Sequence, residues 1–437
     1  MQGPQDTSAR KNVLHGVAVV LVVAGLAAQV VGPAPPDLGA IPAPSRWFDS
    51  AYLARAAAYR RPLYATALLA LVVRVAIPCL IAFTKRGQRA VDWIVGRVGP
   101  HRPARAAASV VLVVVVLTDL VLLPLAFWDS FIHEGAFGFR TQGLLGWARD
   151  WTVTAVLGWL VVGGVVLGGW ALVRRLEWLW PPVVGLGAAG LIMLFALTSP
   201  LIIEPLFLRT RLLEAGPIRA EVQRILVRAD VQIDRILVGD ASRRTTKENA
   251  YVSGLGGTRQ VVLFDTLLTE RTPAETGLVL AHELGHLRHG DIIRAALLAG
   301  AGAITLMYGL AVLLQWRATT GRQEDQADPR AAAVVVTVAV LATVLGMPLA
   351  LVFSRRAEAA ADLYALNLTA DPATHEALQI NLARANLADP APPGWVTALW
   401  MTHPSTVARL EMGRRWPFPA ELGAPARGTQ QPDGTVE

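Results

Sequence analysis

Apolar residues gather into seven long runs, and the segments between the runs mix charged and polar residues. A helix that crosses the hydrocarbon core of a membrane needs about 20 predominantly apolar residues. The pattern therefore predicts seven membrane-spanning helices, near residues 12–31, 62–84, 106–128, 152–173, 179–203, 292–315 and 331–353. We interpret the first run as a retained anchor, because six further spans follow it and it is long for a signal peptide.

The first long polar segment, after the fifth span, has local signs of folded structure. Arg235–Asp240 (RILVGD) predicts a short strand, and Asn249–Asp265 predicts a hairpin that turns at Gly256–Gly257. A helix is expected to begin after Thr272, because Thr-Pro-Ala-Glu has the sequence of a capping box with proline at the first helical position. Gly290 is a natural end for this helix.

The second polar segment follows the seventh span, so both segments lie on the same membrane face. The predicted fold class is mainly α: a seven-helix membrane bundle with a split α+β protein domain on one face. The expected organisation is membrane helices in 1–203, the first part of the soluble domain in 204–291, membrane helices in 292–353, the second part in 354–416, and a disordered tail in 417–437.

Composition agrees with a membrane protein. Of the 437 residues, 53% are hydrophobic and 17% charged, whereas soluble domains carry about 25% charged residues. The net charge of +7 favours contact with anionic headgroups of a lipid bilayer over binding to nucleic acid. The single cysteine, Cys79, excludes an intramolecular disulfide and a cysteine-based metal cage.

Two charges fall inside predicted spans, Arg74 in the second and Asp119 in the third. Because an isolated charge in hydrocarbon is costly, both are expected to face the bundle interior. There they would pair with each other or line a hydrated cavity.

The capped helix contains His282-Glu283-Leu284-Gly285-His286. Residues four apart lie on one face of a helix, so both imidazoles can bind the same zinc ion. Glu283 lies beside them and can take a proton from a zinc-bound water. The alternative is a pair of surface histidines on a capped helix.

A catalytic zinc needs a third protein ligand and keeps one position open for water. His289 is poorly placed, because one helix would have to stretch around the metal. Glu358 and Asp362, in the segment SRRAEAAAD, share a helical face. One carboxylate can bind zinc while the other holds a liganding imidazole. Spacing alone does not separate this arrangement from a solvated acidic face.

The motifs AHELGH and SRRAEAAAD, with the later His403-Pro404-Ser405…Arg409, resemble those of the type I CAAX prenyl protease family. This is a family of integral-membrane, gluzincin-type zinc metalloproteases, and the heat-shock membrane protease HtpX is a shorter relative. The resemblance covers about residues 60–415 and also includes WDSFIHEGAFGFRTQ, PLIIEPLFLR and KENAYVSGLGGTRQVVLFDTLL.

The resemblance implies a role for each matching residue. His282, His286 and Glu358 would bind one Zn²⁺ per chain, and Glu283 would be the general base. Asp362 would hold a liganding histidine in place.

The resemblance also implies residues that act on the substrate. His403 would hydrogen-bond the developing oxyanion or the substrate backbone, and Arg409 would brace the His403 loop. An edge strand would bind the peptide in an extended form, formed by Asn249, Ala250, Tyr251, Val252, Ser253 and Gly254. The family more often has a bulky aromatic residue where this chain has Ala359.

The predicted function is a membrane zinc metalloendopeptidase that hydrolyses membrane-associated or lipidated peptides. Nothing in the sequence recognises an isoprenoid, so quality control of membrane proteins, as in HtpX, remains an alternative. A non-catalytic scaffold with a structural zinc is an alternative of another class, and a transporter is a third. The sequence indicates no oligomeric state.

The orientation in the membrane is ambiguous. Counted on the short loops, thirteen Lys and Arg lie on the side opposite the soluble domain and six on its own side, which would place that domain outside the cell. Arginines that flank the spans reduce the difference to thirteen against twelve. The resemblance places the domain in the cytoplasm, and the Ala-, Arg- and Gly-rich composition suggests a bacterial plasma membrane. We follow the resemblance.

Overall fold

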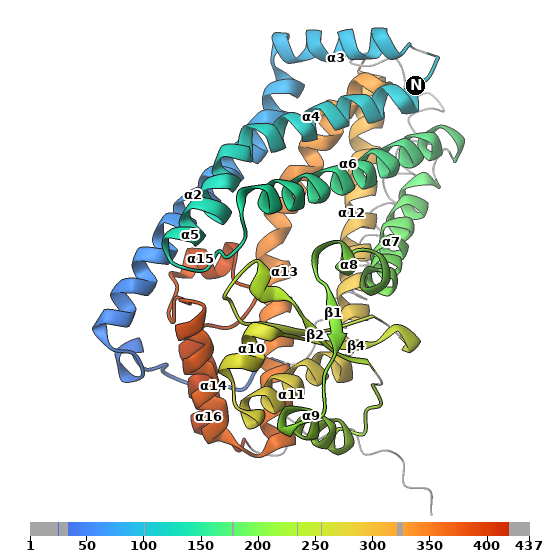
Figure 1. The fold of residues 1–437 in the computed structure, drawn as a ribbon. Helices are drawn as coiled ribbons and strands as arrows, with labels where there is room; N and C mark the ends of the chain where they lie inside the picture. The colour runs from blue at the N-terminus through green and yellow to red at the C-terminus, as the bar shows by residue number, and fades with distance from the viewer. Residues whose placement is uncertain are drawn as a thin grey trace, which may run out of the picture.

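The computed structural model describes residues 25, 34–99, 101–176, 179–233, 235–254, 256–320 and 327–418, and it is mainly helical (Figure 1). The predicted fold class is confirmed: long apolar helices form one end of the molecule, and a small sheet with shorter helices forms the other. The predicted span at 12–31, apart from residue 25, lies outside the described residues. Of the predicted disordered tail at 417–437, the structure describes only 417 and 418. Phe418 packs against a buried cluster that includes Leu363 and Met412, so the prediction is wrong at the start of this segment.

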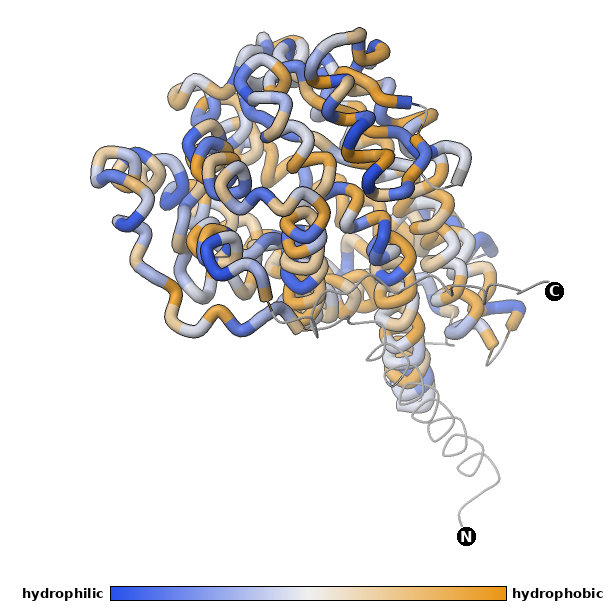
Figure 2. The backbone as a smooth tube through the Cα atoms, turned by 90° about the horizontal axis from the view of Figure 1, so that it is seen from below, coloured by the Kyte–Doolittle hydropathy of each residue, from blue (hydrophilic) through white to orange (hydrophobic). Residues whose placement is uncertain are grey.

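Six helices in the described part of the chain are long and apolar enough to cross a membrane. They account for the second to seventh predicted spans. Figure 2 shows hydrophobic stretches, in orange, along much of the backbone. Their bounds are α2 Ser50–Phe83, α4 Pro103–Phe127, α6 Leu144–Arg175, α7 Trp180–Ile202, α12 Asp291–Thr319 and α13 Ala332–Thr369. A π-helix, Trp128–His133, and α5, Glu134–Ala136, extend α4.

Small and branched side chains allow these helices to pack closely. Ala106, Ala107, Val110 and Val111 of α4 are buried in one apolar cluster. Asp119 accepts a hydrogen bond of 2.7 Å from the indole of Trp159 on α6, which satisfies a carboxylate within the span.

Asp119 and Arg74, which were expected either to pair or to line a hydrated cavity, form no pair in the described structure. The Arg74 side chain is exposed.

The sheet has four strands in the order β1-β2-β4-β3. The central pair, β2 and β4, is parallel, and the outer pairs are antiparallel. The strands are β1 Thr210–Leu212, β2 Arg235–Gly239, β3 Ala250–Ser253 and β4 Gln260–Phe264. The predicted hairpin is therefore present as β3 and β4, and β3 forms one edge of the sheet.

Helix α11, Pro273–His289, packs beside the sheet and begins with the predicted capping box. The Thr272 side chain accepts from the Glu275 amide, and the Glu275 side chain accepts from the Thr272 amide. The helix ends at Gly290, whose φ of +65° lies in the left-handed region that glycine adopts easily. Because α12 starts at Asp291, the capped helix leads directly into a membrane helix.

Helix α13 runs without a break from the membrane bundle past α11. The predicted boundary at residue 354 therefore falls inside one continuous helix of 38 residues. At Gly285 the two helices approach so closely that a Cβ atom would lie 2.8 Å from Cα of Ala361. The sequence of small residues in α13 thus lets it lie against α11.

The other helices complete the two ends of the molecule. Near the sheet are α8 Glu204–Phe207, α9 Pro217–Arg228, α10 Asp265–Glu270, α14 Pro372–Ala385, α15 Gly394–Leu399 and α16 Thr406–Arg415. At the opposite end of the bundle, α3, Lys85–Val98, lies across the ends of the membrane helices (Figure 1).

Candidate metal centre

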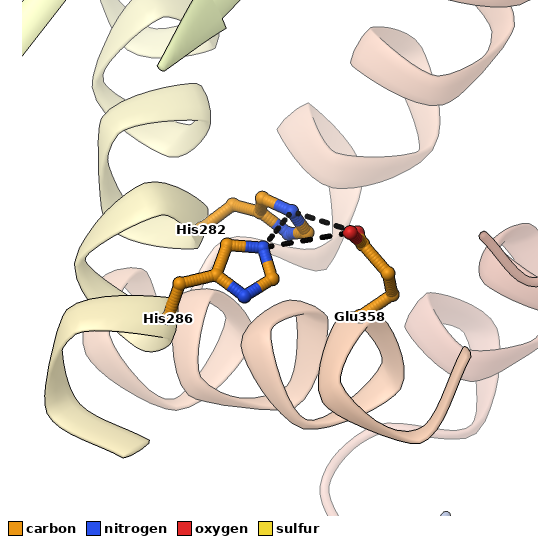
Figure 3. Close-up of side chains that lie close together, drawn as sticks. All are labelled: His282, His286 and Glu358. Carbon is orange, nitrogen blue, oxygen red and sulfur yellow. Dashed lines mark hydrogen bonds and ion pairs between the residues drawn. The ribbon is translucent and has the colours of Figure 1, made fainter. Parts of the chain in front are cut away.

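Three side chains from two helices converge between α11 and α13 (Figure 3). The Nε2 atoms of His282 and His286 lie 3.3 Å apart. Glu358 reaches them from α13, with its Oε2 3.2 Å from Nε2 of His282 and its Oε1 3.7 Å from Nε2 of His286. One ligand atom from each of these three described residues lies within 4.8 Å of the other two, so together they could hold one metal ion.

The donor set fits zinc. Two imidazoles and one carboxylate are the protein ligands of a class of catalytic zinc sites that keep one position open. Oε2 of Glu358 is buried close to Nε2 of His282, and no well-aligned hydrogen bond satisfies it, so this oxygen has capacity to bind a cation. His282 and Glu358 are nearly buried, with side chains 11% and 12% exposed.

A buried ion pair fixes the His282 ring. Oδ1 of Asp362 lies 2.8 Å from Nδ1 of His282, so Nε2 of the ring faces Glu358. Arg409 donates two hydrogen bonds to Asp362, of 2.7 and 2.6 Å. The resemblance implied that Arg409 braces the His403 loop; its guanidinium instead contacts Asp362.

His286 is held in the same way by a residue that the sequence analysis missed. Oδ2 of Asp291 lies 2.8 Å from Nδ1 of His286. One indication of this contact was visible in the sequence: Asp291 is an acidic residue directly after Gly290, at the start of the next helix. By contrast, His289 stacks edge-on against Tyr364, with ring centroids 6.1 Å apart, and lies outside the three-residue group.

Glu283 lies between the imidazoles and the edge strand. Its Oε2 accepts a hydrogen bond of 3.3 Å from the amide of Val252. Burial raises the pKa of the Glu283 carboxyl above its ordinary value. A carboxylate with a raised pKa can accept a proton and release it again near neutral pH.

His403 approaches from the loop before α16. Its Nε2 lies 3.1 Å from Oε2 of Glu358, and Thr402 holds its Nδ1 at 2.8 Å. Its side chain is half exposed, so it can reach both the metal centre and a ligand in front of it.

The predicted substrate strand lies beside this centre. Ala250, Tyr251, Val252 and Ser253 form β3, and Asn249 and Gly254 flank it. In the described sheet, β3 pairs only with β4, so its other edge is free of strand partners. Tyr251 donates a hydrogen bond to Glu204, which ties the strand to the end of the membrane bundle.

A cavity of about 1280 Å³ opens from the metal centre into the bundle. Val252, Glu283 and His286 line its polar end. Its remaining wall comes mainly from apolar residues of α12 and α13, including Leu298, Ala299, Leu306, Met347, Ala350 and Phe353. The centre is therefore accessible from a hydrophobic space between two membrane helices.

Two family descriptions match the chain, peptidase family M48 over residues 213–416 and the CAAX prenyl protease N-terminal region with five membrane helices over residues 40–209. The chain belongs to the CAAX prenyl protease family. The resemblance found in the sequence motifs is thus confirmed over residues 40–209 and 213–416.

Curated relatives include enzymes from distant organisms. The chain is 31% identical to CAAX prenyl protease 1 of Saccharomyces cerevisiae over 40% of its length, which spans 39% of the yeast protein. It is 26% identical to the metalloprotease YhfN of Bacillus subtilis, over 69% of this chain and 71% of that protein. A crystal structure of Ste24p from S. mikatae has the same fold, with a TM-score of 0.70, 19% identity, and coverage of 91% of this chain and 98% of that one.

Proposed function

We propose that this chain is an integral-membrane zinc metalloendopeptidase that hydrolyses peptide bonds of membrane-associated or lipidated peptides. The observation that carries the proposal is the convergence of His282, His286 and Glu358 beside Glu283 at the mouth of an apolar cavity. Residues 204–291 and 354–416 would then be two parts of one protease domain. Residues 1–203 and 292–353 would be its membrane part.

His282, His286 and Glu358 would hold the zinc ion. When bound there, zinc supplies a Lewis acid that polarises the scissile carbonyl and lowers the pKa of water. Asp362 and Arg409 hold the His282 ring in its liganding orientation, and removing such a partner usually weakens metal binding.

The chain's own residues carry out the proton transfers. Glu283 accepts a proton from the attacking water and returns it to the leaving amine. His403 donates a hydrogen bond to the developing oxyanion or the substrate backbone. A donor in this position is worth about 3 kcal/mol of transition-state stabilisation.

The free edge of β3 gives the substrate a place to bind. An extended peptide can add to the edge of a sheet through main-chain hydrogen bonds. The Val252 amide points toward Glu283, so a peptide on this edge would pass in front of the general base. Asn249 and Gly254 would form the two ends of this binding strand.

The apolar cavity supports a substrate with a lipid or membrane-inserted part. The names of the yeast relatives, CAAX prenyl proteases, support a lipidated C-terminal peptide. Cleavage of membrane proteins in quality control is the second candidate, since the same cavity would accept an apolar helix. The Ala-, Arg- and Gly-rich composition supports a bacterial plasma membrane, and the family resemblance supports a protease domain in the cytoplasm.

The test uses the purified full chain in detergent with a farnesylated C-terminal peptide, the same peptide without the lipid, and an unfolded membrane protein. Glu283→Gln is expected to retain its zinc and to lose about 10²–10⁴-fold in turnover, because general-base catalysis contributes that much. Glu270→Gln, at an exposed carboxylate on α10, is the matched control. Full activity of Glu283→Gln would remove the proposed mechanism, and the three substrates distinguish the two candidate functions.

A further inference from the structure

A second pocket lies on the membrane face opposite the metal centre. It has a volume of about 600 Å³ and is formed by the start of α4 and the end of α6, both at the end of the bundle away from the sheet (Figure 1). We call it the arginine pocket, after four of its lining residues, Arg102, Arg105, Arg174 and Arg175. The remaining lining residues are Pro103, Ala104, Leu167 and Ala171.

Among the described residues, no carboxylate opposes the four positive charges. None lines the pocket, and none of the four arginines forms an ion pair with a described residue. Arginines near the sheet behave differently: Arg244 pairs with Asp150 at 2.7 Å, and Arg224 pairs with Glu221. Like charges around one pocket repel one another, so an anion bound among them would be stabilised by all four.

The backbone adds to the positive potential. Helix α4 starts at Pro103, and no side chain caps its first turn. The first amide groups of a helix are unpaired, and they carry the positive end of the helix dipole. Ala104 and Arg105, which carry such amides, both line the pocket. A phosphate group is a suitable ligand, because it accepts hydrogen bonds both from guanidinium groups and from these amides.

The position of the pocket indicates that the phosphate group belongs to a lipid. α4 and α6 both have the length and hydropathy of membrane spans, so their ends lie at the depth of lipid headgroups. Leu167, about two turns inward from Arg174 and Arg175 along α6, is 42% exposed and offers an apolar surface next to the charges.

Helix α3, which packs against the start of α4, has the features of a helix that lies in the membrane interface. It buries Val91 and Val95 and exposes Trp93 at 62%. Arg97 lies over the Trp93 ring at 5.2 Å. Basic amphipathic helices with an exposed tryptophan bind at the surface of anionic membranes.

We propose that the arginine pocket binds the phosphate-bearing headgroup of an anionic phospholipid, with an acyl chain lying along the apolar surface of α6 at Leu167. Basic pockets between membrane helices on the cytoplasmic side bind anionic lipid headgroups, and the same charge attraction acts at a pocket on the other face. The proposal does not depend on the catalytic function. It also accounts for part of the positive charge that the sequence places on this face.

The experiment measures lipid binding to the purified full chain in detergent. Native mass spectrometry and thermal melting are recorded with phosphatidylglycerol, with phosphatidylcholine, and with inorganic phosphate alone. Wild-type protein is expected to retain phosphatidylglycerol and to melt at a higher temperature with it than with phosphatidylcholine. Inorganic phosphate is expected to have no such effect.

The variants locate the site. Each arginine near a lipid phosphate strengthens binding roughly fivefold, so the double variants R102Q/R105Q and R174Q/R175Q are each expected to bind phosphatidylglycerol roughly 25-fold more weakly. The matched control, R86Q/R89Q, removes two exposed charges from α3 on the same face. Because these residues do not line the pocket, the control is expected to weaken phosphatidylglycerol binding clearly less than either pocket variant. Two double variants are used so that each removes only two charges from the pocket. Circular dichroism verifies that each variant is folded.

Three results would overturn the proposal. If R86Q/R89Q lost as much phosphatidylglycerol binding as the pocket variants, the lipid would be attracted by diffuse surface charge and not by the pocket. Stabilisation by inorganic phosphate equal to that by phosphatidylglycerol would indicate a site for the free anion. Equal binding of phosphatidylglycerol and phosphatidylcholine would show that the arginines do not select an anionic lipid.

Discussion

Oδ2 of Asp291 lies 2.8 Å from Nδ1 of His286, five positions earlier in the chain. Asp362 has the same relationship to His282, also at 2.8 Å. Each histidine therefore has one nitrogen bound to a carboxylate and the other directed at Glu358. Because Asp291 is the first residue of the membrane helix α12, the orientation of one candidate ligand depends on where that helix begins.

Replacing Asp291 by alanine is expected to weaken zinc binding about 10–100-fold, the usual cost of losing a hydrogen-bond partner of a liganding histidine. Competition with a chelator of known affinity measures the effect. The control is Asp92→Ala. Like Asp291, which pairs with Arg294, Asp92 is a helical carboxylate with an arginine partner, Arg330 at 3.0 Å, but it lies at the opposite membrane face. Unchanged zinc affinity in Asp291→Ala would show that Asp291 does not position His286.

Gly285→Ala tests the close approach of the two helices that carry the ligands. The new Cβ would lie 2.8 Å from Cα of Ala361 and 3.1 Å from its Cβ, so α11 and α13 would have to separate. Overpacking of this kind costs about 1–3 kcal/mol. We expect a lower melting temperature together with weaker zinc binding.

The matched control for this change is Gly309→Ala in α12, where no atom lies within 4 Å of the added Cβ. Alanine is the better helix former, so this variant should melt at the same temperature as the wild type or higher. If Gly285→Ala also melted like the wild type, α11 and α13 would not be in direct backbone contact at this point.

Glu411 predicts a pH dependence of stability. Hydrogen bonds from Arg414, and further bonds from Arg415, lower the pKa of the fully buried Glu411 carboxyl from 4.5 to about 2. Because the pKa in the folded protein is below that in the unfolded chain, the stabilisation is complete above about pH 4.5 and is lost as the pH falls toward 2.

The measurement is the difference in melting temperature between wild-type protein and Glu411→Gln from pH 7 to pH 3. We expect a constant difference down to about pH 4.5 and a narrowing difference below it. Glu270→Gln, at an exposed carboxylate, should show a small difference throughout. A difference for Glu411→Gln that stays the same across the range would mean that this carboxylate is not held ionised by its arginines.

Local patterns in the sequence predicted the elements that carry the site. The hydropathy of the sequence located all six membrane helices of the described residues, and the capping box located the start of α11. The four-residue spacing of His282 and His286 placed both rings on one face. Each of these features depends on residues close together in the chain, where helix geometry alone decides which side chains are neighbours.

Long-range partners were harder to predict. The contacts of Arg409 with Asp362 and of Trp159 with Asp119 join segments 47 and 40 residues apart, and no local rule selects one arginine or tryptophan among many. The uninterrupted course of α13 was also missed. A change from apolar to charged residues indicates where a helix leaves the membrane but does not require the helix to end there.

The most direct test of the metal centre is a crystal structure of the zinc-loaded protein with anomalous data at the zinc edge. We predict one zinc per chain, about 2.0–2.2 Å from Nε2 of His282, Nε2 of His286 and a carboxylate oxygen of Glu358, with a fourth position that no protein atom fills. A zinc ion enclosed by four protein ligands, or bound away from Glu358, would contradict the account.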